Sequence, residues 1–276
     1  MDSKTLRKVQ LAQLEIAKEI KRVCDENDIK YFMCGGTLIG AVRHNGFIPW
    51  DDDMDFAMLR SEYDRFQNIV KEKLDKQYFF QTLETDSNYG MAFGKLRKLG
   101  TVYIENASQK SAAHNELYVD IFPFDNLPGL KATRKKQKKL VMFYRKLMLC
   151  YAKVKPWLRY PFGYNRFIRW CGYLPFRILA SVLPRNNAIK KYNHIMKIAN
   201  NDNSCQNVYS QGILTYENSQ FKKSVFENLI ELPFEDTTFK APKDYDSYLR
   251  FLYGDYMVPP PENQRENRHQ IIEVKI

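Results

Sequence analysis

The chain of 276 residues contains 44% hydrophobic and 14% aromatic residues, a composition that excludes a disordered protein and suffices for a sizeable core. Its five cysteines include no C-x-x-C pair, which argues against a disulfide framework or a zinc site and fits reduced thiols in a cytosolic protein. The net charge of +11 is unevenly spread, because residues 126–201 hold 18 Lys and Arg and no acid, and the rest of the chain sums to −7.

The first 30 residues show no apolar run between a basic region and a cleavage site, so no secretory signal is expected. Apolar runs in the basic stretch are interrupted by arginine or proline and fall short of the roughly 20 residues that a spanning helix needs. We therefore expect a cytoplasmic protein without a transmembrane helix.

Helical and strand patterns alternate through the first 125 residues. Apolar residues at helical spacing predict helices over 3–24, 37–44 and 61–76. Short apolar or alternating runs predict strands over 29–34, 54–59, 78–83, 91–98, 101–105 and 116–122. This alternation of helices and strands is typical of an α/β (α+β) fold.

The basic stretch is expected to be a helical insert rich in aromatic residues. Helices are predicted over 131–149 and 188–199, whereas four prolines are expected to break 157–183 into short pieces. One more helix is predicted over 245–253, ended by Gly254. We expect a catalytic core over 1–125, the insert over 126–201, and a C-terminal segment over 202–276 that packs back on the core.

Four aspartates stand within five positions, at 51, 52, 53 and 55, directly before a buried strand. In an extended segment alternate side chains share a face, so Asp51, Asp53 and Asp55 point one way. Asp52 points the other way with two apolar residues and is expected to be structural. Asp53 and Asp55 are then about 7 Å apart along the strand, a spacing that suits two carboxylates binding one or two divalent ions.

Asp120 is the best candidate for a third ligand, because it is a lone carboxylate within an apolar strand, where an unpaired charge is costly. The alternative is an acidic turn whose aspartates cap a helix or pair with nearby arginines. Surface pairing is a weak remedy for so dense a cluster of like charges, so we favour a metal site. Strand parity leaves open whether Asp51 or Asp120 completes the metal shell.

Gly35, Gly36 and Thr37 form a turn between a strand and a helix. Glycines allow an anion to approach the backbone, and the first turn of a helix presents free N–H groups. Alone the pattern is weak, but beside a metal site it predicts a phosphate-binding turn. Three cations are candidates to add positive charge to the same pocket: Arg43, Lys95 and Arg97.

Two linked runs, 35–44 and 46–55, closely resemble the LicD/fukutin family of phosphotransferases. The stretches 119–123 and 252–257, with Pro260 and a distal His269, are similar to the same family. The combined pattern covers most of the chain apart from the insert. His269 can reach the site only if the C-terminal segment folds back.

The resemblance implies a nucleotidyltransferase-like core, which is a mixed β-sheet with flanking helices. It places Gly35 and Gly36 at the nucleotide phosphates, assigns Mg²⁺ binding to Asp53 and Asp55, and matches Asp120 to the third acidic position. One or two Mg²⁺ ions are expected, with Mn²⁺ as a substitute. Asp120 is a candidate to orient or deprotonate the attacking hydroxyl.

The resemblance also implies transfer of phosphocholine from CDP-choline to a hydroxyl of a lipid-linked glycan, a precursor of teichoic acid, capsule or lipopolysaccharide, with release of CMP. Other CDP-linked alcohols (ethanolamine, glycerol, ribitol) are alternative donors. A nucleotidyltransferase is the second enzymatic reading, and a membrane or nucleic-acid adaptor with a degenerate site is the non-enzymatic one.

Three interpretations of the insert compete: nucleic-acid binding, a plain helical subdomain, and contact with a membrane. Anionic lipids attract cations, and Trp and Tyr favour the interface. Because the phosphotransferase interpretation supplies a lipid-linked acceptor, we favour an anionic membrane surface and a peripheral position on its inner face, and nucleic acid is the least favoured.

Overall fold

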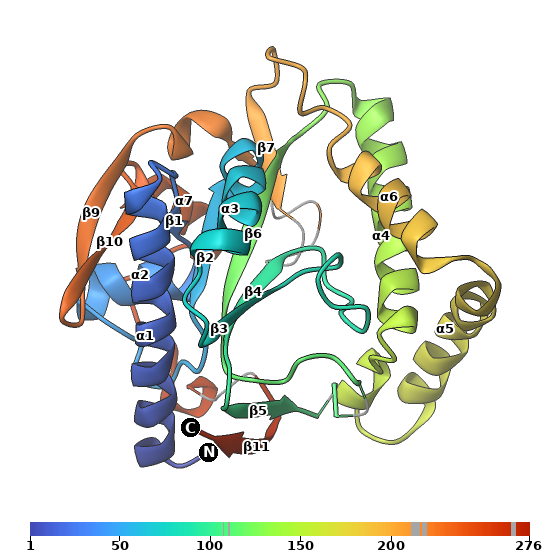
Figure 1. Ribbon diagram of the computed structural model, residues 1–276, viewed down its shortest axis with the longest axis horizontal. Coiled ribbons are helices and arrows are strands. Elements are labelled where there is room, and N and C mark those ends of the chain that lie inside the picture. Colours follow the sequence, from blue (N-terminus) through green and yellow to red (C-terminus); the bar gives the residue numbers. More distant parts are fainter. Residues whose placement is uncertain (107, 110, 211–215, 217–219, 266–268) are drawn as a thin grey trace.

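The computed structural model describes residues 1–276 except 107, 110, 211–215, 217–219 and 266–268 (Figure 1). Its centre is a mixed sheet in the order β1-β2-β6-β4-β3, to which β7 adds at β6 and β8 adds at β7. Only β2 and β6 pair in parallel among these described strands. The strands are β1 Phe32–Met33, β2 Asp55–Leu59, β3 Tyr78–Gln81, β4 Gly94–Lys98, β6 Tyr118–Asn126, β7 Asn207–Ser210 and β8 Gln220–Lys222.

Helices flank this sheet as predicted. Helix α1, Ser3–Glu26, begins where Asp2 accepts a hydrogen bond from the Thr5 N–H at 2.9 Å, and it buries one apolar stripe. Helix α3, Arg60–Lys73, packs against α1, β2 and β6. Helix α2, Gly35–His44, packs against β2 and against helix α7, Tyr245–Tyr253. The predicted α+β class is confirmed, and the predicted elements before residue 126 are present with ends displaced by a few residues.

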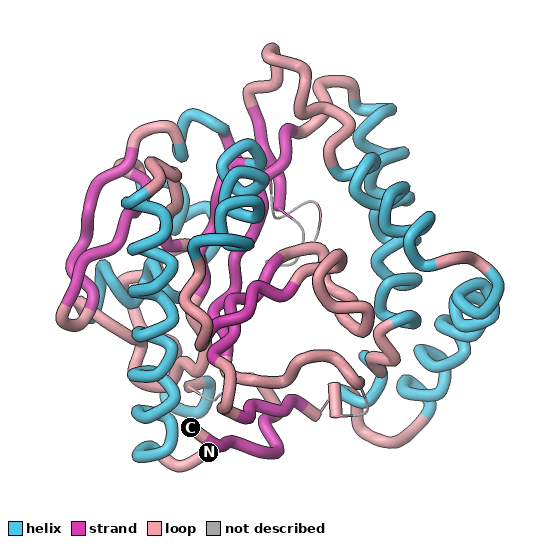
Figure 2. The backbone as a smooth tube through the Cα atoms, viewed as in Figure 1, coloured by secondary structure: helices cyan, strands magenta, loops and turns pink. Residues whose placement is uncertain are grey.

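The helical insert (residues 126–201) packs around a hydrophobic cluster that also contains Leu83 and Tyr89 from the preceding part of the chain. Helices α4, Lys131–Tyr151, and α6, Arg185–Met196, pack together around a second hydrophobic cluster. A 3-10 turn, Pro156–Arg159, leads to helix α5, Tyr164–Val182, which lies on α4. Figure 2 shows this part of the molecule as helices alone, whereas strands and helices mix in the rest.

The prediction that prolines break residues 157–183 into short pieces is wrong. Helix α5 runs uninterrupted for 19 residues with Pro175 inside it. Phe176, Leu179 and Ala180 pack against the insert's core, and this tertiary packing outweighs the loss of one backbone hydrogen bond at the proline. Pro161 and Pro184 lie outside the helix, where they are tolerated.

The C-terminal segment contains strands that we did not predict. Besides β7 and β8, these are the hairpin of β9, Leu229–Phe234, and β10, Thr237–Pro242, and strand β11, Ile271–Lys275. Strand β11 pairs with β5, Val102–Glu105, in a separate two-stranded sheet. Apolar side chains of this segment, such as Phe234, belong to the main core. The boundaries proposed at residues 125 and 201 stay predictions.

No helix in the described part of the chain is both long enough and apolar enough to cross a membrane.

Candidate active site

The site lies where β2 begins, beside the first half of β6. Asp55 is the first residue of β2, and its register partner in β6 is Asp120. Partners in neighbouring strands point to the same face, and the strands are about 4.8 Å apart. The Asp120 N–H also donates to the Met54 carbonyl at 2.9 Å, which fixes the register. The prediction that Asp120 lies on a neighbouring strand is therefore confirmed.

The predicted alternation of the aspartates is present in their burial but not in the direction of Asp52, because β2 begins only at Asp55 and the Asp52 carboxylate stays close to those of Asp51 and Asp53. Asp51, Asp53 and Asp55 are partly exposed, whereas Asp52 is 1% exposed. Asp52 accepts a hydrogen bond from the Tyr103 hydroxyl at 3.1 Å and has the role of a structural anchor. One carboxylate oxygen from each of Asp51, Asp52 and Asp53 lies within 4.8 Å of the other two. We call Asp51, Asp53, Asp55 and Asp120 the carboxylate cluster.

The cluster holds more negative charge than its surroundings neutralise. Burial raises the pKa of Asp55 well above its usual range, and the charges of Asp53 and Asp120 raise it further. Burial likewise raises the pKa of Asp53 and of Asp120. Carboxylates that raise one another's pKa in this way gain most from a divalent cation, for which oxygen atoms are the preferred ligands. The donor set thus fits Mg²⁺.

Lys95 supplies the nearest positive charge. In β4 it is the register partner of Asp120, and its Nζ lies 2.7 Å from Asp120 Oδ1 and 3.2 Å from the centre of the Tyr118 ring. Burial lowers the pKa of Lys95, and Asp120 partly offsets this effect. A cation bound by Asp120 would compete with Lys95, which would then be available to a phosphate.

The Gly-Gly turn lies against the carboxylates. Helix α2 begins at Gly35, and none of the described side chains caps it at Cys34. A Cβ on Gly35 would lie 3.1 Å from Asp55 Oδ2, and one on Gly36 would lie 2.6 Å from Asp51 Oδ2. Glycine therefore lets the carboxylates approach the N-terminal end of α2, where the helix dipole favours negative charge.

Thr37 connects these two elements, because its Oγ1 accepts a hydrogen bond from the Asp55 N–H at 2.8 Å. Its side chain therefore positions β2 against α2. A contact between Thr37 and phosphate through its backbone stays a prediction.

The two predicted arginines are engaged in other contacts. Arg97 donates to Gln81 Oε1 at 2.6 Å and to the Glu116 carbonyl. Arg43 donates from Nη1 to the Tyr256 carbonyl at 2.7 Å and so connects α2 to the C-terminal segment. Their predicted roles at the nucleotide stay predictions, and the contacts above give both a structural role.

His269 is a site residue that we did not assign. Its Nδ1 lies 3.0 Å from Asp52 Oδ1, and its Nε2 lies 3.8 Å from Asp53 Oδ2. Burial lowers its pKa, but the hydrogen bond to Asp52 and the charge of Asp53 outweigh this and raise the pKa to about 9. A carboxylate only accepts hydrogen bonds, so Nδ1 donates to Asp52 and Nε2 faces the cluster.

The pairing of β11 with β5 brings His269 to this position. Arg265, from the same segment, lies over the Trp50 ring at 5.0 Å. The C-terminal segment thus folds back onto the start of the aspartate run. This is the condition under which we expected His269 to reach the site.

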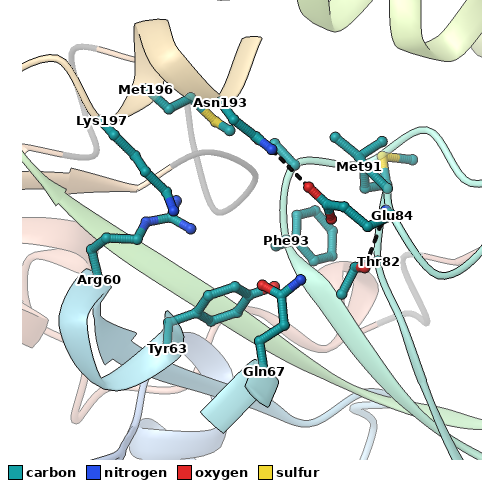
Figure 3. Close-up of a pocket in the computed structure, with 12 residues that line it drawn as sticks. Arg60, Tyr63, Gln67, Thr82, Glu84, Met91, Phe93, Asn193, Met196 and Lys197 are labelled. Atoms are coloured by element: carbon teal, nitrogen blue, oxygen red, sulfur yellow. Dashed lines mark hydrogen bonds between the residues drawn. The ribbon is translucent and has the colours of Figure 1, made fainter. Parts of the chain in front are cut away.

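A separate small hollow of about 40 Å³ lies between the core and the insert (Figure 3). Arg60, which lines this hollow, follows the last residue of β2, whereas Asp55 of the carboxylate cluster is the first. The hollow is therefore separate from the cluster. Its polar groups pair with one another or with neighbours: Arg60 with Asp125 at 2.7 Å and Asn193 with Glu84 at 2.7 Å. This hollow lacks the chemistry of the cluster.

Residues 28–167 match the family model described as "LicD/FKTN/FKRP, nucleotidyltransferase domain". The chain is 30% identical over 271 residues to "Lipopolysaccharide cholinephosphotransferase LicD" of Haemophilus influenzae, which covers 98% of this chain and 97% of that protein. It is 25% identical over 114 residues to "Ribitol 5-phosphate transferase FKRP" of Mus musculus, which covers 40% of this chain and 20% of that protein.

Proposed function

The chain belongs to the LicD/FKTN/FKRP nucleotidyltransferase-domain family and is a phosphotransferase, and from this premise we propose that it transfers phosphocholine from CDP-choline to a hydroxyl of a lipid-linked cell-surface glycan, releasing CMP. The acceptor proposed is a precursor of lipopolysaccharide, teichoic acid or capsule. The name of the Haemophilus relative supports phosphocholine and lipopolysaccharide, because the similarity extends over nearly the whole of both chains.

The observation that carries this proposal is the register of β2 and β6, which brings Asp55 and Asp120 together beside Asp53 and Asp51. These four carboxylates would hold Mg²⁺, with Mn²⁺ as a substitute and room in the donor set for one or two ions. Bound there, Mg²⁺ would neutralise the charge of the donor's pyrophosphate.

The chain's own groups position the donor and the acceptor. The N-terminal end of α2, at Gly35 and Gly36, offers backbone N–H groups and a favourable dipole to a phosphate. Lys95 offers a buried ammonium, and His269 directs Nε2 toward the cluster. Such preorganised donors are the main source of catalysis in phosphoryl transfer.

The reaction forms a bond between the acceptor oxygen and the phosphorus of phosphocholine and breaks the bond from that phosphorus to the CMP oxygen. The acceptor hydroxyl must lose its proton. With one Asp120 oxygen on Mg²⁺ and Lys95 released from Asp120 to the phosphate, the other Asp120 oxygen is the one that we assign to orient the hydroxyl and accept its proton.

The proposed acceptor is carried by a lipid, so the enzyme would work as a peripheral protein on the inner face of the membrane. The basic insert would face anionic lipids there. The family's ribitol 5-phosphate transferases support CDP-ribitol, or another CDP-linked alcohol, as the second donor candidate.

The test is a donor screen with the purified protein, Mg²⁺ and a glycolipid acceptor, in which CMP release and product mass are measured. CDP-choline is expected to be used best among CDP-choline, CDP-ethanolamine, CDP-glycerol and CDP-ribitol, and a chelator is expected to abolish transfer. A product heavier by a nucleotide in place of phosphocholine would indicate a nucleotidyltransferase. A protein that binds none of these donors with Mg²⁺ would indicate an adaptor.

A further inference from the structure

Helix α5 has an outer face that nothing in the described chain covers. None of its 19 residues is fully buried. Tyr164 is 77% exposed, Phe167 60%, Ile178 62% and Val182 72%. A single exposed apolar residue needs no explanation, but a contiguous row of them marks an interaction surface.

The sequence spacing makes this row a continuous stripe. Residues three, four or seven positions apart share one face of a helix, and the exposed apolar side chains of α5 follow that spacing from end to end. These are Tyr164, Phe167, Ile168, Trp170, Leu174, Ile178 and Val182. Phe176, Leu179 and Ala180 form the opposite face and pack against the insert's core. The helix is therefore apolar on two sides, of which only one has a partner within the chain.

The charge around the stripe is entirely positive. Arg166 and Arg177 are 11 residues apart, which is three helical turns, so they lie on one flank of it. Lys131, Lys135 and Lys139, exposed on one face of the first half of α4, add to the positive charge of the insert. Because residues 126–201 contain no Asp or Glu, the partner of this surface is expected to be apolar with a negatively charged boundary.

We infer that α5 is an interfacial helix that lies along an anionic membrane and buries its outer stripe below the lipid headgroups. The arginines on its flank would remain at the headgroups. Phe162, 95% exposed just before the helix, would enter the bilayer with it. The arginines and the finding that no described helix can span a membrane both favour a helix parallel to the surface. Its biological purpose rests on the lipid-linked acceptor proposed above, whereas membrane binding is measurable without any transfer.

Two other partners fit the surface less well. In a symmetric pair of chains the same patch meets itself, so two inserts with 18 cations each would face one another. Nucleic acid would use the cations, but single-strand binding depends on aromatic rings that stack on bases. Tyr164, Phe167 and Trp170 offer rings only in the first half of the stripe, and the second half, with Leu174, Ile178 and Val182, offers none.

The test is vesicle flotation with the full-length protein. The wild type is expected to float with vesicles of equimolar phosphatidylcholine and phosphatidylglycerol and to bind pure phosphatidylcholine far less. Ile178→Ser/Val182→Ser is expected to lower binding to the anionic vesicles by roughly tenfold or more, since buried apolar area is lost. Leu11→Ser/Val258→Ser, which removes two exposed apolar residues elsewhere, is the matched control and is expected to bind like the wild type.

Several results would overturn the inference. One is the absence of wild-type flotation with anionic vesicles at physiological salt. Another is equal binding by the wild type and a folded Ile178→Ser/Val182→Ser variant, which would show that the protein binds the vesicles by electrostatic attraction alone. A third is a stable dimer, seen by light scattering, that this variant converts to a monomer while neither protein binds vesicles.

A salt wash of vesicle-bound wild-type protein also tests whether α5 inserts into the bilayer, without any variant. Retention on the vesicles when salt is raised after binding supports insertion, because buried apolar contacts are not screened, and complete release contradicts it. Flotation with no transfer from any donor would refute only the proposed function.

Discussion

The carboxylate cluster and the outer face of α5 differ in charge, burial and the range of sequence that builds them. The cluster combines residues from the Asp51–Asp55 run and β6, and Lys95 of β4 and His269 of the C-terminal segment lie against it. The face of α5 comes from 19 consecutive residues and is held only on its inner side. The carboxylate cluster therefore depends on the register between strands that are far apart in the sequence, whereas the exposed stripe of α5 depends on the periodicity of one helix.

The largest effect is expected at the cluster. Asp53→Asn/Asp55→Asn should lower CMP release from CDP-choline by at least about a thousandfold, because both of these charges are proposed to bind Mg²⁺ and both are lost. The thermal unfolding temperature should be unchanged or higher, since these like charges repel. Asp236→Asn, which removes a surface pair with Lys18 at 2.7 Å, is the control and should stay within about twofold of wild type. Wild-type transfer by the double variant would refute the site.

The Gly-Gly turn should be the next most sensitive point. In Gly36→Ala the new Cβ would lie 2.6 Å from Asp51 Oδ2, so the carboxylate or the turn must move. A displacement of about 1 Å at a reacting group costs on the order of a hundredfold in rate, which is the loss expected in transfer assays. Gly172→Ala in α5, where nothing lies within 4 Å of a Cβ, should transfer normally. Equal rates for both variants would show that the approach of Asp51 to Gly36 is dispensable.

A smaller effect is expected at His269. His269→Asn should lower kcat/KM for CDP-choline by about tenfold, as expected for the loss of one positioned hydrogen-bond donor. Because Asp52 orients His269, Asp52→Asn should act on the same step, and the double variant should lose little more than either single variant. His194→Asn, in α6, is the matched control. Losses that multiply in the double variant would show that the two residues act independently.

The smallest effect should appear in the insert. Pro175→Ala restores a backbone donor within α5 and should raise the free energy of unfolding by about 1 kcal/mol in urea titrations. Transfer to a water-soluble acceptor should not change, because α5 does not contribute to the cluster. Lower stability would show that the contact of α5 with α4 depends on the proline.

Local pattern was sufficient for much of the fold. Helical periodicity predicted α1, and short apolar runs predicted the strands that contain Asp55 and Asp120. The structure contains all three elements, as α1, β2 and β6. Parity separated Asp52 from Asp51, Asp53 and Asp55, and burial agrees. The failures were at Pro175, where packing on α4 outweighs the local preference, and in the strands after residue 202, whose patterns are short.

The sequence by itself determined the dense run of aspartates that predicts a metal site, the family resemblance and the positive charge of residues 126–201. Only the tertiary structure decided that Asp120 lies opposite Asp55, that Lys95 neutralises it, and that His269 returns to Asp52. It also showed the outer face of α5 to be exposed. The physical reason is that side-chain chemistry and periodicity are local properties, whereas strand register, charge pairing and burial depend on contacts between residues far apart in the chain.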